Sequence, residues 1–145
     1  MTGVIRVSAV LITDERNRAL MVRKHATAAF MQPGGKPEPG ETPAETAVRE
    51  LAEELGITVD AADLVPLGTH RTAAANEAGF DVEADCFALR LTETKAVRAA
   101  AEITEARWFT LDDLATAIIA PLSTQALLPL VWGEAPVHAA LRTRN

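Results

Sequence analysis

Apolar residues form short runs along the first part of the chain, separated by polar turns. Residues 4–12 are mostly β-branched or apolar, the polar segment 14–17 follows, and residues 18–24 make a second run. Two such runs joined by a short turn are typical of a β-hairpin. The next segment, 25–41, contains two adjacent glycines and three prolines. We therefore expect a shaped loop without regular structure there.

A helical period begins after this loop. Thr42 is a good N-cap residue, Pro43 suits the first helical position, and Glu45 completes the sequence of a capping box. Gly56 supplies a stop signal. Apolar residues between these signals recur at spacings of three and four, which predicts one buried helix face. They are Ala44, Ala47, Val48, Leu51 and Leu55.

The second half of the chain returns to strand patterns. Residues 62–72 and 80–91 both indicate strands, and apolar and acidic positions alternate within the second of them. Residues 105–109 indicate another strand, after which Thr110 and Asp113 form a second helix-start signal. Strands, a long helix, more strands and then helices together predict an α/β fold with a mixed sheet.

One apolar stretch, residues 114–132, carries no charge and has the length of a membrane span. Pro121 and Pro129 interrupt it, and polar residues at 123–125 break its apolar character. We therefore expect no membrane span but two short core helices. A homodimer surface is an alternative use of the same stretch.

Composition narrows the class of protein. The chain has 145 residues, which suits a single domain over 1–145. Its net charge of −6 opposes binding to nucleic acid, because the phosphate backbone attracts basic proteins. Cys86 is the one cysteine, so no internal disulfide can form, and we interpret it as a small buried residue. The N-terminus lacks an export signal, and a cytoplasmic location fits best.

Three acids stand near the end of the expected helix, where the helix dipole is already negative. Glu50, Glu53 and Glu54 are spaced i, i+3 and i+4, so we expect one negative patch on the side away from the apolar face. Arg49 neutralises only part of it. Two interpretations remain: a solvated helix face, or a site for Mg²⁺ or Mn²⁺, which prefer clustered oxygen ligands.

The order of residues in this region resembles the signature box of the Nudix hydrolases. Gly35 is followed after five residues by Glu41, and after seven more by the segment 49–57, which reads RELAEELGI. The resemblance implies an α/β/α sandwich with a mixed sheet. It also implies hydrolysis of a nucleoside diphosphate linked to another moiety, with Mg²⁺ or Mn²⁺ as cofactor. A Nudix-fold module that binds a nucleotide or metabolite without cleaving it is the alternative.

The resemblance also implies roles for single residues. The metal ligands would be three carboxylates and a backbone carbonyl, from Glu50, Glu53, Glu54 and either Gly34 or Gly35. Arg49 and Glu41 fall at positions that brace the loop and orient the carboxylates. The general base differs among family members, and Glu53 is our first choice. Glu50, Glu102 and Glu105 are its rivals.

Substrate contacts are expected around the loop. Arg23 and Lys24 are candidates to meet phosphates, and Glu102 and Glu105 are either an extra ligand or base, or plain surface acids. Three aromatic residues are candidates to stack on a base, with the core as the alternative for each: Phe30, Phe80 and Trp108. The histidines are too scattered for a metal trio: His25, His70 and His138.

Overall fold

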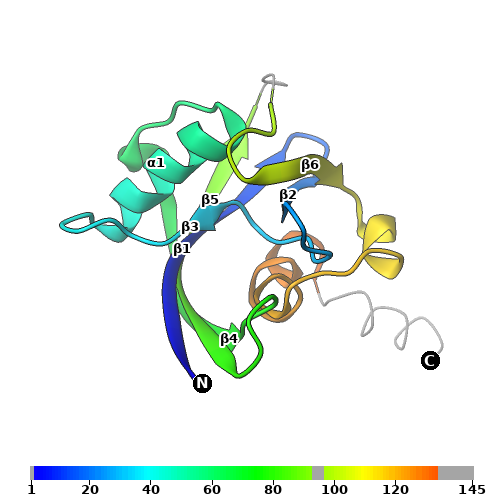
Figure 1. Cartoon of the computed structure of the whole chain (residues 1–145). Coiled ribbons are helices and arrows are strands. Elements are labelled where there is room, and N and C mark those ends of the chain that lie inside the picture. The colour runs from blue at the N-terminus through cyan, green and yellow to red at the C-terminus, as the bar shows by residue number, and fades with distance from the viewer. Residues whose placement is uncertain (1, 93–96, 134–145) are drawn as a thin grey trace.

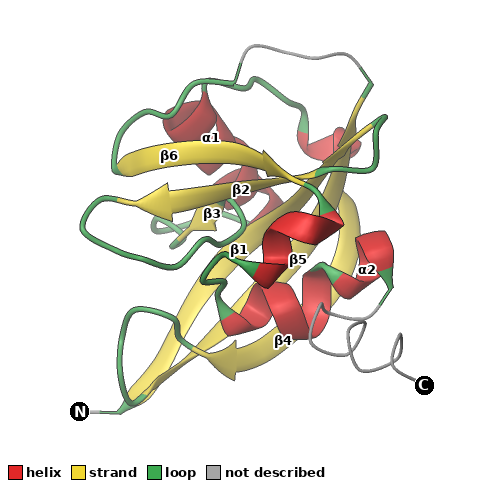
Figure 2. Ribbon diagram, turned by 90° about the vertical axis from the view of Figure 1, so that its right-hand side faces the viewer, coloured by secondary structure: helices red, strands yellow, loops and turns green. Residues whose placement is uncertain are grey.

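The computed structural model describes residues 2–92 and 97–133, and the strands in them form one mixed sheet with helices on both faces (Figure 1, Figure 2). The strand order is β4-β5-β1-β2-β6, and β3 pairs with β1. β1 and β5 run parallel along their whole length, whereas the other pairs are antiparallel. The bounds are β1 Gly3–Asp14, β2 Ala19–Lys24, β3 Gly34–Gly35, β4 Val65–Ala73, β5 Phe80–Leu91 and β6 Ile103–Phe109. The expected mixed sheet is confirmed.

The loop after the hairpin contains a strand that we did not expect. β1 and β2 pair next to their turn, through Thr13 and Ala19. Farther along the same edge of β1, Gly34 and Gly35 pair with Ala9 and Ser8, so the loop adds a short third strand. Gly34 has φ +151°, and a Cβ there would collide with the carbonyl oxygen of Ser8. The absence of a side chain lets the loop lie this close to β1.

The predicted helix is present as α1 (Pro43–Leu55). The Glu45 N–H donates to Thr42 Oγ1 at 3.2 Å, and the Thr42 N–H donates to Glu45 Oε1 at 2.8 Å. This is the complete capping box. Gly56 ends the helix in the left-handed conformation, with φ 67°.

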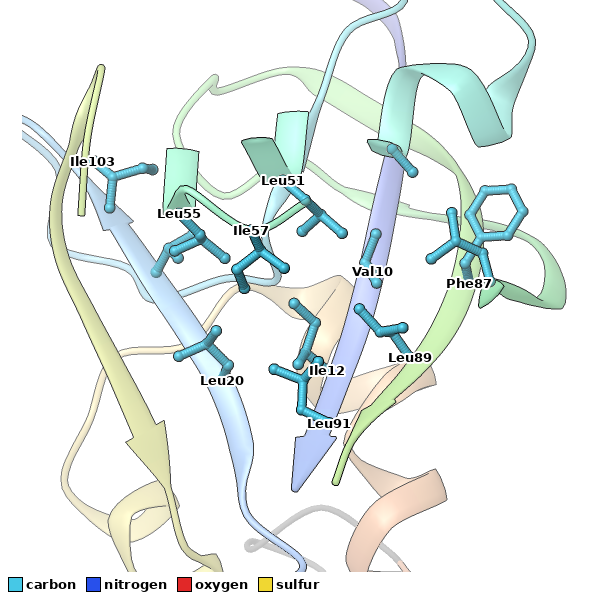
Figure 3. Packing of buried hydrophobic residues seen from close by; sticks show 13 residues of the cluster. Val10, Ile12, Leu20, Leu51, Leu55, Ile57, Phe87, Leu89, Leu91 and Ile103 are labelled. Atoms are coloured by element: carbon cyan, nitrogen blue, oxygen red, sulfur yellow. The ribbon is translucent and has the colours of Figure 1, made fainter. Parts of the chain in front are cut away.

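The sheet buries a different apolar cluster on each face. Val10 and Ile12 of β1 point to the first cluster, whereas Ala9 and Leu11 point to the second, as the alternation of a strand requires. Figure 3 shows the first cluster, where α1 packs on the sheet. The opposite face is covered by η3 (Ser123–Leu127), a π-helical turn, and α2 (Pro129–Trp132). This arrangement is the expected α/β/α sandwich.

The C-terminal apolar stretch belongs to the core, and its helices are shorter than expected. Leu114, Leu122 and Leu127 are buried in the second cluster, beside Cys86. The helix expected after Thr110 is only the 3-10 turn η2 (Leu111–Ala115), because the chain just beyond it pairs with the segment around Phe30. Within the described ranges, no helix combines the length and apolar character needed to cross a membrane.

The strand expected at 62–72 also starts later. A second 3-10 turn, η1 (Ala61–Asp63), precedes β4.

Candidate active site

Glu54 lies inside the protein, which corrects the expectation that the three acids share one patch on the side of the helix away from its apolar face. Its exposed fraction is 1%, whereas the side chain of Glu53 is 51% exposed and that of Glu50 lies between them. The cause is helix geometry, since position 54 borders the buried stripe of Leu51 and Leu55. The Gly34 N–H of β3 donates to Glu54 Oε1 at 3.0 Å, so the glycine loop and the last turn of α1 meet here.

The electrostatics of Glu54 are unusual for a carboxylate. Burial raises its pKa to about 8, and the Gly34 N–H only partly offsets this effect. Its second oxygen, Oε2, is buried, and no described residue forms a hydrogen bond with it. A buried polar atom without a partner is costly, so strain, a catalytic role, or a bound water or ion has to account for it.

Arg49 organises the acids around this position. Its Nε and Nη2 donate to the two carboxylate oxygens of Glu41 at 2.7 and 3.0 Å, and Nη2 also donates to the Lys36 carbonyl at 2.9 Å. Nη1 lies 2.9 Å from Glu50 Oε1 and 3.3 Å from Glu53 Oε2. Hydrogen bonds from Arg49 lower the pKa of Glu41 to about 2. The geometry therefore agrees with the bracing roles expected for Arg49 and Glu41.

Glu50 lies directly against the glycine loop. A Cβ on Gly35 would lie 2.5 Å from the carboxyl carbon of Glu50, so a glycine is needed for this carboxylate to occupy its place. Burial raises the pKa of Glu50, and the Arg49 guanidinium opposes the rise. Two carboxylates with raised pKa values thus lie at the same loop.

The donor set fits a hard divalent cation. Within residues 2–92 and 97–133, no three Asp, Glu, His or Cys side chains are gathered as a preformed cage. Arg49 Nη1 contacts both Glu50 and Glu53 and occupies one side of each carboxylate. The unpartnered buried oxygen of Glu54 and the neighbouring carboxylates supply the oxygen ligands that Mg²⁺ and Mn²⁺ prefer.

A cavity of about 620 Å³ opens beside Glu50, whereas Glu53 and Glu54 are not among its lining residues. Arg49, Glu50, Lys24 and Glu102 all line it, and Lys24 Nζ lies 3.4 Å from Glu102 Oε1. Arg23 is not among the lining residues; it donates to the Thr27 carbonyl at 3.0 Å and pairs with Glu105 at 3.4 Å. The structure therefore brings Lys24 and Glu102 to the cavity but engages Arg23 and Glu105 with each other.

The structure places Phe30 in the core, not at the cavity. Its ring is buried in the second cluster, 4.9 Å from the ring centroid of Phe109, because the segment around it pairs with the chain near Ile119. Trp108 packs against the first cluster, with the Arg18 guanidinium 5.5 Å from its ring centroid. These contacts bear out the core alternative for both residues. Phe80 is half-buried beside Gly3, also outside the described cavity lining.

Two cavity residues escaped the sequence analysis. Gln32 and Ser123 are buried polar side chains that line the cavity, and Ser123 Oγ donates to Gln32 Oε1. They are 91 positions apart in the chain, so no local pattern joins them. His25 and His70 take no part in the site, and His138 lies outside the described residues.

Comparisons with known proteins agree with this geometry. The family model described as NUDIX domain matches residues 4–128. The chain is 41% identical over 58 residues to the 8-oxo-dGTP diphosphatase of Escherichia coli, covering 37% of this chain and 45% of that protein. It is 34% identical over 74 residues to Nudix hydrolase 3 of Caenorhabditis elegans, covering 51% and 28%. The matched segments thus span less than half of either relative.

Solved structures show the same fold. The E. coli dihydroneopterin triphosphate pyrophosphohydrolase superposes with a TM-score of 0.71 at 21% identity, covering 88% of this chain and 94% of that one. The MutT protein of Bacillus halodurans gives 0.61 at 25% identity, covering 80% and 74%. Since the family model extends from β1 through η3 and includes the loop, the acids and both cores, this chain belongs to the Nudix family.

Proposed function

We propose that this chain is a metal-dependent hydrolase of phosphoric anhydrides, acting on a nucleoside diphosphate derivative by attack of water at phosphorus. One observation carries the proposal. The buried carboxylate of Glu54 is fixed by the Gly34 N–H through one oxygen, while the other lacks a partner among the described residues. A structural carboxylate would need both oxygens satisfied, whereas a metal ligand keeps one for the ion.

The metal ligands in this proposal are Glu50, Glu53 and Glu54, with the Gly35 carbonyl completing the set. When bound, Mg²⁺ or Mn²⁺ supplies positive charge that offsets the phosphates and acidifies coordinated water. Arg49 keeps the acids together in the free protein and donates to Glu50 at 2.9 Å. Its contact with Glu53 is longer, at 3.3 Å, so Glu53 is the carboxylate that is released most readily.

The chain itself supplies the proton transfer and the phosphate contacts. Glu53 takes a proton from the attacking water, whose oxygen bonds to phosphorus while the bridging P–O bond breaks. The leaving phosphate departs with the bridging oxygen. Lys24 and Lys36 line the cavity and contribute positive charge for the phosphates. Glu102 Oε1 lies 3.4 Å from Lys24 Nζ and pairs with it.

The substrate class is a nucleotide. Two relatives, from E. coli and Proteus vulgaris, are named as 8-oxo-dGTP diphosphatases, which supports a nucleoside triphosphate. Nucleotide sugars and ADP-ribose share the same anhydride, and they belong in the test.

The test is a panel of substrates assayed with Mg²⁺. It contains ATP, GTP, CTP, UTP, 8-oxo-dGTP, a nucleotide sugar and ADP-ribose, and kcat/KM is measured for each. We expect hydrolysis of at least one, loss of activity with EDTA, and a loss of orders of magnitude in Glu53→Gln. Glu15→Gln, which neutralises an exposed acid in the β1–β2 turn, is the control and should act as wild type. No release of product from any substrate would favour a binding module instead.

A further inference from the structure

Lys24 and Glu102 form an ion pair in the cavity lining, where the end of β2 meets the segment before β6. Lys24 Nζ lies 3.4 Å from Glu102 Oε1, and the two side chains are 31% and 60% exposed. An ion pair of this length and exposure contributes little to stability, because water screens both charges. Folding stability therefore does not explain why the pair is present.

Two tight turns fix the backbone around the pair. One spans residues 24–27 and the other spans residues 100–103, and each is closed by a backbone hydrogen bond, of 3.1 and 3.0 Å respectively. The His25 N–H joins the two turns by donating to the Glu102 carbonyl at 2.8 Å. Each turn contains one left-handed alanine, with φ values of 62° and 54°: Ala26 and Ala101. Alanine rarely adopts this conformation, so the surrounding contacts must hold both turns in place.

The segment that carries Glu102 also completes the end of α1. The Arg98 N–H donates to the Leu55 carbonyl at 3.2 Å, and the Ala100 N–H donates to the Glu54 carbonyl at 2.9 Å. The last carbonyls of a helix have no partners within the helix, so these two bonds anchor the segment to the turn that carries the acids. The position of Glu102 is thus tied to that of Glu54.

The charge of Lys24 competes for the same acids as a cation. Lys24 and Glu50 line one cavity. Burial raises the pKa of Glu54, whereas the Lys24 ammonium lowers it and the Glu102 carboxylate raises it, so both charges act at this acid. Glu54 Oε2 has no hydrogen-bond partner in the described part of the chain, and it attracts an ammonium group that lacks another partner. A lysine bonded there would occupy the place of a metal ion.

We propose that Glu102 is a positioning residue for Lys24, which holds the ammonium group at the cavity wall and away from the carboxylates of Glu50 and Glu54. The inference rests on the proposed function, in which these carboxylates bind the cation and Lys24 meets the phosphates. Glu102 itself neither binds the ion nor takes a proton from water. Its effect on the cation therefore passes through Lys24 and disappears when Lys24 is removed.

The experiment is a double-mutant cycle on Mn²⁺ binding without substrate, followed by electron paramagnetic resonance. Wild type, Glu102→Gln, Lys24→Met and the double variant are compared at about 0.15 M salt, which screens long-range charge effects. We expect Glu102→Gln to weaken Mn²⁺ binding by at least about fivefold when Lys24 is present, and by less than about twofold in the Lys24→Met background.

Activity gives a second readout. In Glu102→Gln, the Mn²⁺ concentration for half-maximal hydrolysis should rise, and saturating Mn²⁺ should restore most of kcat, because excess ion displaces the ammonium. A general base or an essential metal ligand would not be rescued in this way. Asp81→Asn is the control, since it breaks an exposed ion pair with Arg71 outside the described cavity lining and should behave as wild type.

Thermal melting checks that each variant is folded. An equal loss of Mn²⁺ binding from Glu102→Gln in both backgrounds would show that Glu102 acts on the ion directly, which would overturn the positioning role. No loss in either background, or a kcat that saturating Mn²⁺ does not restore, would overturn it as well. Absence of Mn²⁺ binding by wild type would instead refute the metal site of the proposed function and, with it, this role.

Discussion

At the scale of single residues, burial of the Glu54 carboxylate destabilises the folded protein. Glu54 is 1% exposed beside the apolar stripe of α1, and from the described residues its carboxylate accepts one hydrogen bond, from the Gly34 N–H. Burying an ionised group without full compensation is destabilising, and the group responds with a raised pKa. The cation of the proposed function would remove this penalty, which would give the fold a reason to keep the acid.

The pH dependence of stability should therefore reveal Glu54. Its folded pKa of about 8 lies above the ordinary value of 4.5, so the folded state holds a proton that the unfolded state has released between these pH values. The free energy of unfolding without metal should fall as pH rises from 4.5 to 8, by on the order of a few kcal/mol. Glu54→Gln should show a flatter profile and higher stability at pH 8. Urea unfolding in EDTA measures both, and parallel profiles would contradict the account.

Substitution by alanine should have different effects at the two loop glycines, Gly34 and Gly35. In Gly35→Ala, the new Cβ meets the end of the Glu50 side chain, which can move, so we expect a near-normal melting temperature and at least about a tenfold loss of kcat/KM. In Gly34→Ala, the Cβ meets the backbone of Ser8 at a φ of +151°, so the fold itself should be destabilised. Melting curves and kinetics on both variants separate the two effects. An unfolded Gly35→Ala protein would argue against a role confined to the site.

At the scale of elements, the features predicted from the sequence are those whose signals are local. The capping box of Thr42 and Glu45 and the stop at Gly56 fixed the bounds of α1, and alternation fixed β5 over residues 80–91. The strand β3 was missed, since it depends on how closely Gly34 approaches Ser8.

The sequence named the residues of the candidate site, but it did not predict which of them are buried. The spacing of the acids predicted that they lie near one another, yet spacing alone does not say which side of the helix the loop covers. Glu54 is buried because β3 and the apolar stripe meet at its position. Phe30 and the pair of Gln32 and Ser123 follow from contacts between the loop and the segment before η3, which a single sequence does not reveal.

The ordered structure of the loop between β3 and α1 should depend on the planar, forked geometry of the Arg49 guanidinium. Arg49→Lys keeps the charge, but an ammonium group cannot bond Glu41, the Lys36 carbonyl and Glu50 in the observed geometry. We expect faster amide hydrogen exchange over residues 36–41 and lower kcat/KM. Exchange in η1 (Ala61–Asp63), far along the chain, is the internal reference. Unchanged exchange in the loop would show that charge alone is sufficient.

At the scale of the whole molecule, the two-faced sheet holds the loop, α1 and the segment before η3 around one cavity. β1 contacts most of this arrangement, because it pairs with β5 along its length and with β2 and β3 on its other edge. The chain carries a net charge of −6, and acids lie where the proposed function places an anionic substrate. In the proposed function, a cation would have to join them before phosphates can approach.

Binding of Mn²⁺ to the protein without substrate tests this claim most directly, because the ion is paramagnetic and its free and bound forms are distinguished by electron paramagnetic resonance. We predict that wild type binds Mn²⁺, that Mg²⁺ displaces it, and that Glu54→Gln weakens binding by at least about tenfold while Glu15→Gln does not. Equal binding by wild type and folded Glu54→Gln, or none by either, would contradict the account.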